Sequence, residues 1–116
     1  MKNKTSWQKQ FNREIFQSEV ARAEGNEGKA RVCARRAASV VIAEYLDRRG
    51  LPDPGASAID RLRFLENLPN IPANVKRAAR HLLMPVSPDH SLPSNVDLIA
   101  EARQLEQELL ENQPPK

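Results

Sequence analysis

The chain has 116 residues, of which 18 are Lys or Arg and 15 are Asp or Glu, giving a formal net charge of +3 at neutral pH. This length suits one ordinary domain with a modest core. Its single cysteine, Cys33, excludes an internal disulfide, and its apolar stretches are too short to span a bilayer. The basic first ten residues lack the apolar run of a signal peptide. We therefore expect a cytoplasmic protein without a membrane partner.

A first helix is predicted over residues 6–24. Thr5 and Gln8 fit a capping box, and Gly25 is placed to end the helix. Apolar residues then recur at the three- and four-residue spacing of an amphipathic helix: Trp7, Phe11, Ile15, Phe16, Val20 and Ala23.

A second helix is predicted from Glu27 to Arg49, with Asn26 as its N-cap and Gly50 as its stop. Its mostly apolar second half predicts a central position in the fold. One side carries small residues that allow a neighbouring helix to approach closely: Ala30, Cys33, Ala34, Ala37, Ala38 and Val41. The first helix is the expected neighbour, with bulk supplied by Trp7, Phe11 and Phe16.

Two shorter helices follow the turn-rich segment 51–57. Ser57 is the expected N-cap of a helix over 58–68 that ends at Pro69, with inward residues Ile59, Leu62, Leu65 and Leu68. Pro72 suits the first turn of the next helix, which Pro85 stops. Its predicted buried face consists of Val75, Ala78, Ala79, Leu82 and Leu83.

The last helix is predicted over residues 95–112, after a proline-rich loop at 85–95. Ser94 and Asp97 repeat the capping pattern. The expected buried residues are Leu98, Ile99, Ala102, Leu105 and Leu109. The sequence thus predicts one all-α domain over 1–116, an antiparallel bundle of four to five helices, with frayed ends at 1–5 and 113–116.

The motifs of catalysis and cofactor binding are incomplete. The segment around Gly28 and Lys29 lacks the first glycine and the hydroxyl of a phosphate-binding loop, and Gly25 to Gly28 matches the loop of a KH domain without the sheet that such a domain needs. No His/Cys cluster has zinc-ligand spacing. We expect no catalytic residue, cofactor or metal.

Basic residues gather on the second and fourth predicted helices. Cations near a helix N-terminus oppose the helix dipole by about 0.3–1 kcal/mol each, so the arginines of the second helix should meet an anion. That anion is either internal, a carboxylate of the last helix or Glu19 or Glu24, or external, nucleic-acid phosphate or an acidic protein. The small net charge favours the internal pairing. The residues that would contact an external phosphate are Arg31, Arg35, Arg36, Lys76, Arg77 and Arg80.

Three segments together resemble the HEPN superfamily of small prokaryotic helical domains. They are GNEGKARVCARRAASVVIAEYLDRRG, SAIDRLRFL and SPDHSLPSNVDLIAEARQL, so the resemblance spans about residues 10–110. Many members of that superfamily are metal-independent ribonucleases or toxin–antitoxin components, and several act as dimers. The resemblance therefore implies a homodimer. The catalytic signature of that family is an arginine, four to six residues, then a histidine.

This chain departs from that signature. Three residues separate Arg77 from His81, nine separate Arg80 from His90, and Lys76, at the right spacing from His81, lacks the bidentate guanidinium. The resemblance therefore implies a non-catalytic HEPN-like domain that binds RNA or a partner protein. Two alternatives stay open: a metal-independent ribonuclease that uses Arg80 with His81 or His90, and a structural homo-oligomer whose basic and acidic faces satisfy each other.

Overall fold

The computed structural model of the chain describes residues 6–55, 57–84 and 97–111. These residues form helices and turns and contain no strand, which confirms the all-α class. The helices in chain order are α1 (Ser6–Ala23), α2 (Glu27–Arg49), α3 (Ala58–Glu66), α4 (Ala73–Leu83) and α5 (Leu98–Glu106), which continues into the π-helical turn η1 (Gln107–Glu111).

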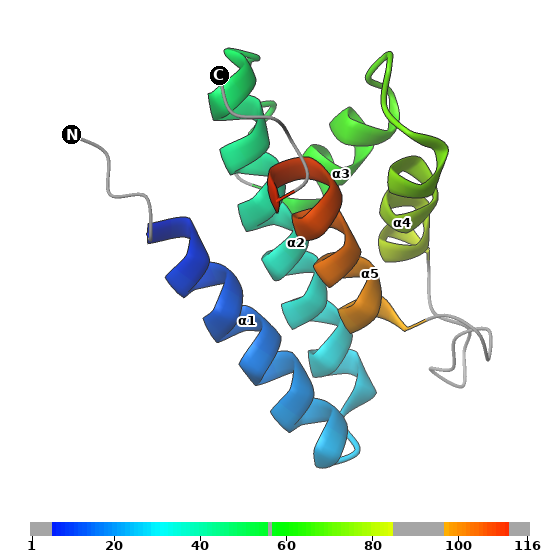
Figure 1. Cartoon of the computed structure of the whole chain (residues 1–116). Helices are drawn as coiled ribbons and strands as arrows, with labels where there is room; N and C mark the ends of the chain where they lie inside the picture. The colour runs from blue at the N-terminus through cyan, green and yellow to red at the C-terminus, as the bar shows by residue number, and fades with distance from the viewer. Residues whose placement is uncertain (1–5, 56, 85–96, 112–116) are drawn as a thin grey trace.

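The longest helix, α2, is the centre of the bundle. It packs against α1, α3, α4, α5 and η1, and Figure 1 shows α1 running antiparallel beside it, α5 crossing in front, and α3 and α4 on the other side. Because neighbours cover most of its circumference, residues such as Ala34, Val41 and Ile42 have no exposed surface. The central position predicted for this helix is confirmed.

Three predicted helix ends are confirmed by their capping contacts. The side-chain oxygen of Asn26 accepts a hydrogen bond from the backbone N–H of Lys29 at 3.1 Å. Ser57 Oγ accepts from the backbone N–H of Asp60 at 3.4 Å. Gly50 has a φ of 67° at the end of α2, a left-handed conformation that glycine adopts without strain.

Other predicted helix ends are wrong by one to three residues. α1 ends at Ala23, one residue early, and α3 ends at Glu66 rather than 68, where the side-chain N–H of Asn67 also donates to the Arg63 carbonyl. Pro72 precedes α4 instead of lying in its first turn, since its ψ of 149° is extended. Leu68, although outside α3, still packs against the core.

The beginning of α5 differs most from the prediction. Asp97 itself is the N-cap, because its side chain accepts from the backbone N–H groups of Ile99 at 3.1 Å and Ala100 at 3.2 Å. The helix therefore starts at Leu98 rather than at residue 95, and its regular hydrogen bonding gives way to the π-helical turn at Gln107. Ser94 and Thr5, the other predicted capping residues, lie outside the described residues.

The small-residue face of α2 receives α1 as predicted, with one exception. Trp7, Phe11 and Ile15 are buried in the core, whereas Phe16 is 61% exposed. Adjacent residues of a helix point about 100° apart, so Phe16 cannot share the inward stripe that contains Phe11 and Ile15. The prediction that Phe16 packs against α2 is wrong.

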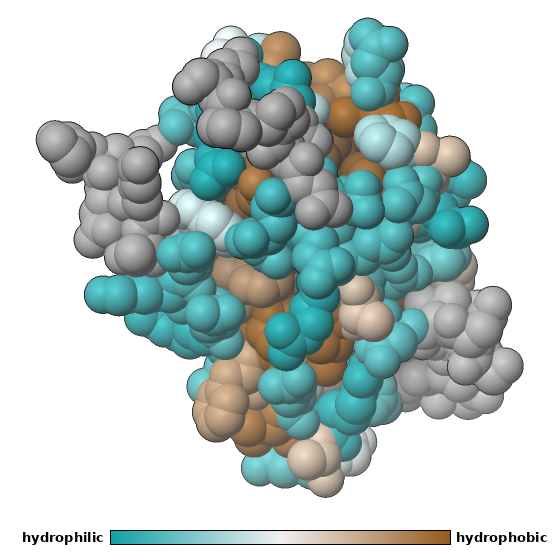
Figure 2. All heavy atoms as spheres, viewed as in Figure 1, coloured by the Kyte–Doolittle hydropathy of each residue, from teal (hydrophilic) through white to brown (hydrophobic). Residues whose placement is uncertain are grey.

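Polar side chains cover most of the face seen in Figure 2, interrupted by an apolar strip between α1 and α5. Within the described ranges, no helix is both long and apolar enough to cross a membrane.

We predict that Phe11→Ala lowers the free energy of unfolding by about 3–5 kcal/mol, because it removes a buried ring from a packed interface. Phe16→Ala should change it by less than about 0.5 kcal/mol, as expected for an exposed side chain. Urea denaturation followed by circular dichroism measures both. Equal losses for the two variants would contradict this packing.

Candidate functional site

Arg35 of α2 binds the C-terminal end of α4. Its Nε–H donates to the carbonyl of Leu82 at 2.5 Å and a terminal N–H donates to the carbonyl of Met84 at 3.0 Å. The last carbonyls of a helix lack partners within the helix and carry its partial negative charge. Arg35 therefore has an internal partner, as predicted. This partner is the C-terminal end of a helix rather than one of the expected carboxylates.

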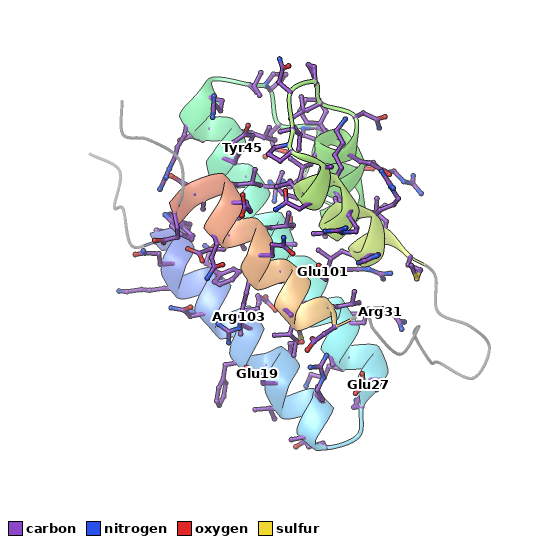
Figure 3. The ribbon with its side chains drawn as sticks, turned by 45° about the vertical axis from the view of Figure 1, so that its right-hand side comes forward. Glu19, Glu27, Arg31, Tyr45, Glu101 and Arg103 are labelled. Carbon is purple, nitrogen blue, oxygen red and sulfur yellow. The ribbon has the colours of Figure 1, made fainter. Side chains whose placement is uncertain are left out.

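Arg31, labelled in Figure 3, lies four residues before Arg35, a spacing that places both on the same side of α2. Its Nε is buried and has no hydrogen-bond partner among the described residues. Burial, and then the charge of Arg31, lower the pKa of the Arg35 guanidinium, which stays charged at any physiological pH.

On α4, Arg80 and His81 each bind a carboxylate from a neighbouring helix. Arg80 Nε donates to Glu66 of α3 at 3.0 Å. His81 pairs through Nδ1 with Glu101 of α5, and because a carboxylate only accepts, Nδ1 carries the proton. The two residues named for a ribonuclease are thus held by structural partners, and His90 lies outside the described residues.

Lys76 and Arg77 complete the predicted basic set on α4. Neither has an ion pair within the part of the chain that the structure describes. Arg77 is exposed and Lys76 is half-buried.

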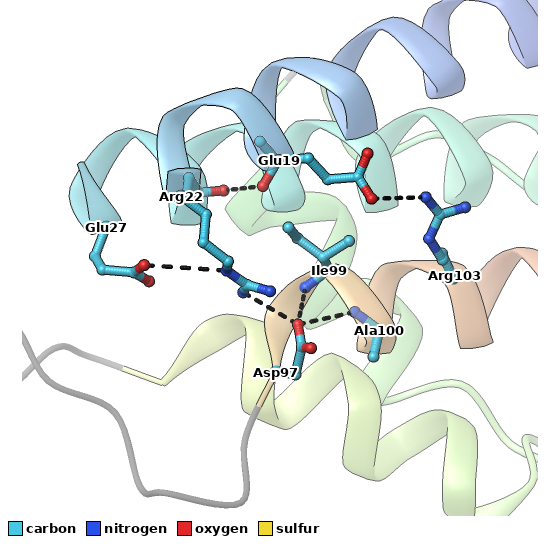
Figure 4. Close-up of polar contacts among 9 residues, drawn as sticks. Glu19, Arg22, Glu27, Asp97, Ile99, Ala100 and Arg103 are labelled. Carbon is cyan, nitrogen blue, oxygen red and sulfur yellow. Dashed lines mark hydrogen bonds and ion pairs between the residues drawn. The ribbon is translucent and has the colours of Figure 1, made fainter. Parts of the chain in front are cut away.

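Two ion pairs join α1 to α5 and its N-cap. Arg22 lies between Asp97, at 3.1 Å, and Glu27, at 4.0 Å, and Arg103 binds Glu19 at 3.1 Å (Figure 4). Figure 3 shows Glu19 and Arg103 pointing toward each other. The predicted basic residues of α2 have no part in these pairs.

Asp97 combines two roles in this network. Burial alone would raise its pKa, but hydrogen bonds from Arg22 and from the backbone N–H groups of Ala100 and Ile99 more than compensate, so the pKa is lowered. A hollow of about 520 Å³ lies between α1 and α5, and the charged residues that line it are Glu19, Arg22, Asp97 and Arg103. These four side chains already pair with one another.

A second hollow, which we call the α2 groove, has a different character. It measures about 450 Å³ and lies along the outer side of α2, between Glu14 of α1 and the first turn of α3. Its lining includes Glu14, Val32, Arg35, Arg36, Val40 and Ile59. Arg36 is exposed and has no ion pair among the described residues, whereas Arg35 is held by α4.

Most of this groove was not predicted from the sequence, which favoured a different environment for one of its lining residues. The sequence pattern placed Ile59 in the core, but Ile59 is only half-buried and lines the groove. It also gave no role to Val32, which is 41% exposed. The sequence does contain one indication of the groove. Val32, Arg36 and Val40 are spaced four residues apart, which places them in one row along a helix.

The walls of the groove are fixed by polar contacts. Arg61 of α3 makes a two-pronged contact with Asp53, at 2.7 and 3.1 Å, and donates to Ser39 of α2 at 3.0 Å. Burial and then Glu14, which lines the groove, raise the pKa of the buried Cys33 thiol. This buried cysteine behaves as the small apolar residue that the sequence analysis predicted.

Among residues 6–55, 57–84 and 97–111, no group of three or more His, Cys, Asp or Glu side chains could hold a metal ion. Comparison of the chain with protein-family models, with curated proteins and with solved structures finds no match.

We predict that Arg35→Lys lowers the free energy of unfolding by about 1.5–3 kcal/mol, because an ammonium cannot reach two carbonyls with the planar fork of a guanidinium. Arg36→Lys is the matched control and should leave stability within about 0.5 kcal/mol of the wild type. Chemical denaturation at low and high salt measures both. An Arg35→Lys variant as stable as the control would show that the contact with α4 contributes nothing.

The π-helical turn creates a pair of like charges. Residues five apart stack in a π-helix, and Glu111 is thereby brought against Glu106. Burial, followed by the hydrogen bond and charge of Glu111, raises the pKa of Glu106 to about 7. The folded state therefore holds a proton that the unfolded chain releases near pH 4.5.

Because the folded-state pKa of Glu106 is raised, its contribution to stability is greatest at low pH and declines as pH rises from about 4.5 to 7. We expect the melting temperature of Glu106→Gln to exceed that of the wild type at pH 8 by more than it does at pH 5. Thermal denaturation at both values measures the difference. Glu24→Gln, at an exposed position, is the control, and an unchanged gap between wild type and Glu106→Gln at the two pH values would contradict this explanation.

Proposed function

We propose that this chain is a non-enzymatic, HEPN-like helical module of the cytoplasm that binds an acidic partner through the outer side of α2. The observation that carries the proposal is the difference between paired and unpaired cations. Arg22, Arg35, Arg80 and Arg103 all have internal partners, but exposed Arg36 has none among the described residues.

Lys29 extends this basic row. It is exposed, lies two helical turns before Arg36, and has no ion pair within the described ranges. Both cations therefore keep their full capacity to attract an anion. Arg31, Arg35 and Arg80 are less suited to a partner than the sequence suggested, since their guanidinium groups are partly buried or already bound.

The alternative of a metal-independent ribonuclease gains no support from this arrangement. A general acid–base pair must reach its substrate, and both Arg80 and His81 face carboxylates of neighbouring helices. Neither residue lines either of the two hollows described above.

RNA is the first acidic partner to test. Among the residues that the structure describes, no aromatic ring lines the α2 groove, so RNA would be held through phosphate and shape rather than through base stacking. Lys76 and Arg77 would add a second set of phosphate contacts.

We expect a labelled structured RNA to bind with an affinity that falls steeply between 50 and 200 mM salt, as counterions are released from phosphate. The double variant Lys29→Ala/Arg36→Ala should reduce the slope of log affinity against log salt by about 2. Fluorescence anisotropy measures the binding, and sedimentation in the same buffers tests for the homodimer that the HEPN resemblance implies.

Arg63→Ala is the matched control, because Arg63 is exposed on α3 and does not line the groove. Absence of RNA binding even at low salt would remove RNA as the partner. An unchanged slope in the double variant would remove Lys29 and Arg36 as its contacts.

A further inference from the structure

We infer that the α2 groove is a docking site for an acidic amphipathic helix of another protein. This inference rests on the proposed function and names the kind of acidic partner. It starts from a feature that phosphate binding does not require, namely apolar side chains on both sides of the unpaired arginine.

The groove alternates apolar and basic positions along α2. Val32 and Val40 each lie one helical turn from Arg36 and line the groove with it. The two valines are eight residues apart, which corresponds to about 12 Å along the helix. This is the length of two turns of a helix laid alongside, and such helices dock through apolar residues at i, i+4 and i+7.

The walls add a third helix to the contact. Ile59 at the first turn of α3 adds apolar surface, and Glu14 of α1 adds one carboxylate. A partner helix would place its apolar row on Val32, Val40 and Ile59. Its acidic side would face Arg36, and a basic or neutral residue would face Glu14, so the charges fix its orientation.

The charge of Arg36 selects an acidic partner. A carboxylate beside an exposed, unpaired guanidinium forms a charge-assisted bidentate contact, and Lys29 carries the same sign further along α2. RNA would use these two cations but would gain nothing from the valines. The combination of apolar floor and basic centre therefore favours a protein helix over a nucleic acid.

The occupant is not supplied by this chain itself. The segments outside the described residues carry lysines at 2, 4 and 116 and a single acid, Asp89. The acidic helical segment α5–η1 of a second copy cannot supply it, because the leucines that alternate with its acids are buried: Leu105, Leu109 and Leu110. The exposed Phe16 of α1 lies between Arg13, which has the same charge as Arg36, and Glu19, which is already paired with Arg103.

The test uses the full chain and three labelled probes. The first is a panel of 16-residue helical peptides with leucine at every third or fourth position, in different registers, and glutamate at most others. The second contains the same residues in scrambled order, and the third is the structured RNA. Fluorescence anisotropy reports each affinity.

We expect at least one peptide of the panel to bind at least tenfold more tightly than its scrambled form. Val32→Asp and Arg36→Glu should each weaken that binding at least tenfold. Phe16→Asp and Arg63→Glu introduce the same changes at exposed positions outside the groove and should stay within twofold of the wild type. Circular dichroism melts confirm folding, and Val32→Ala replaces Val32→Asp if that variant unfolds.

The remaining outcomes overturn the inference in distinguishable ways. Equal binding of ordered and scrambled peptides would mean that charge alone determines the affinity. The proposal of an acidic partner would then be kept, and the inference of a docked helix would be rejected. Binding of RNA alone would identify the partner as nucleic acid. Failure of all probes would remove both the docked helix and the proposed function.

Discussion

The close approach of α1 to α2 is the constraint on which the rest of the bundle depends. It is possible because α2 presents alanines and one cysteine where α1 presents Trp7, Phe11 and Ile15. A larger residue at Ala34 or Ala37, which have no exposed surface, would force the two helices apart. With this pair of helices in place, other sides of α2 pack against α5, α3 and α4. The row formed by Val32, Arg36 and Val40 is left to line the groove.

The arginines show how one residue type serves three different purposes in a small domain. Arg35 ties the end of α4 to α2, Arg22 and Arg103 join α1 to α5, and Arg36 is left facing solvent. Basic character on one helix is therefore a poor guide to a binding surface until internal partners have been assigned. Here Arg35 is bound internally and Arg36 is exposed, so the basic residues of α2 that face solvent are fewer than the sequence indicates.

The sequence predicted the fold more fully than the candidate site, and the reasons are physical. Helix number, order and several caps depend on local signals such as Asn26, Ser57 and Gly50, which act within one turn. The partner of Arg35 is 47 residues away, and backbone carbonyls carry no sequence signal. Phe16 was misplaced because spacing alone does not settle which of two adjacent apolar residues, Ile15 or Phe16, faces inward. The groove was missed because it needs the first turn of α3 beside α2, a tertiary contact.

Sequence separation also limits what the ion pairs between α1 and α5 can achieve. The buried hydrogen bond from Ser18 to the Ala30 carbonyl closes 12 residues, whereas the Arg103–Glu19 pair closes 84. The logarithmic cost of loop closure makes the longer loop about 2 kcal/mol more expensive. An exposed ion pair contributes only about 0–1 kcal/mol, so it cannot recover that entropy. The buried leucines of α5 must therefore bring the two ends of the chain together, and the ion pairs add little to the stability of that contact.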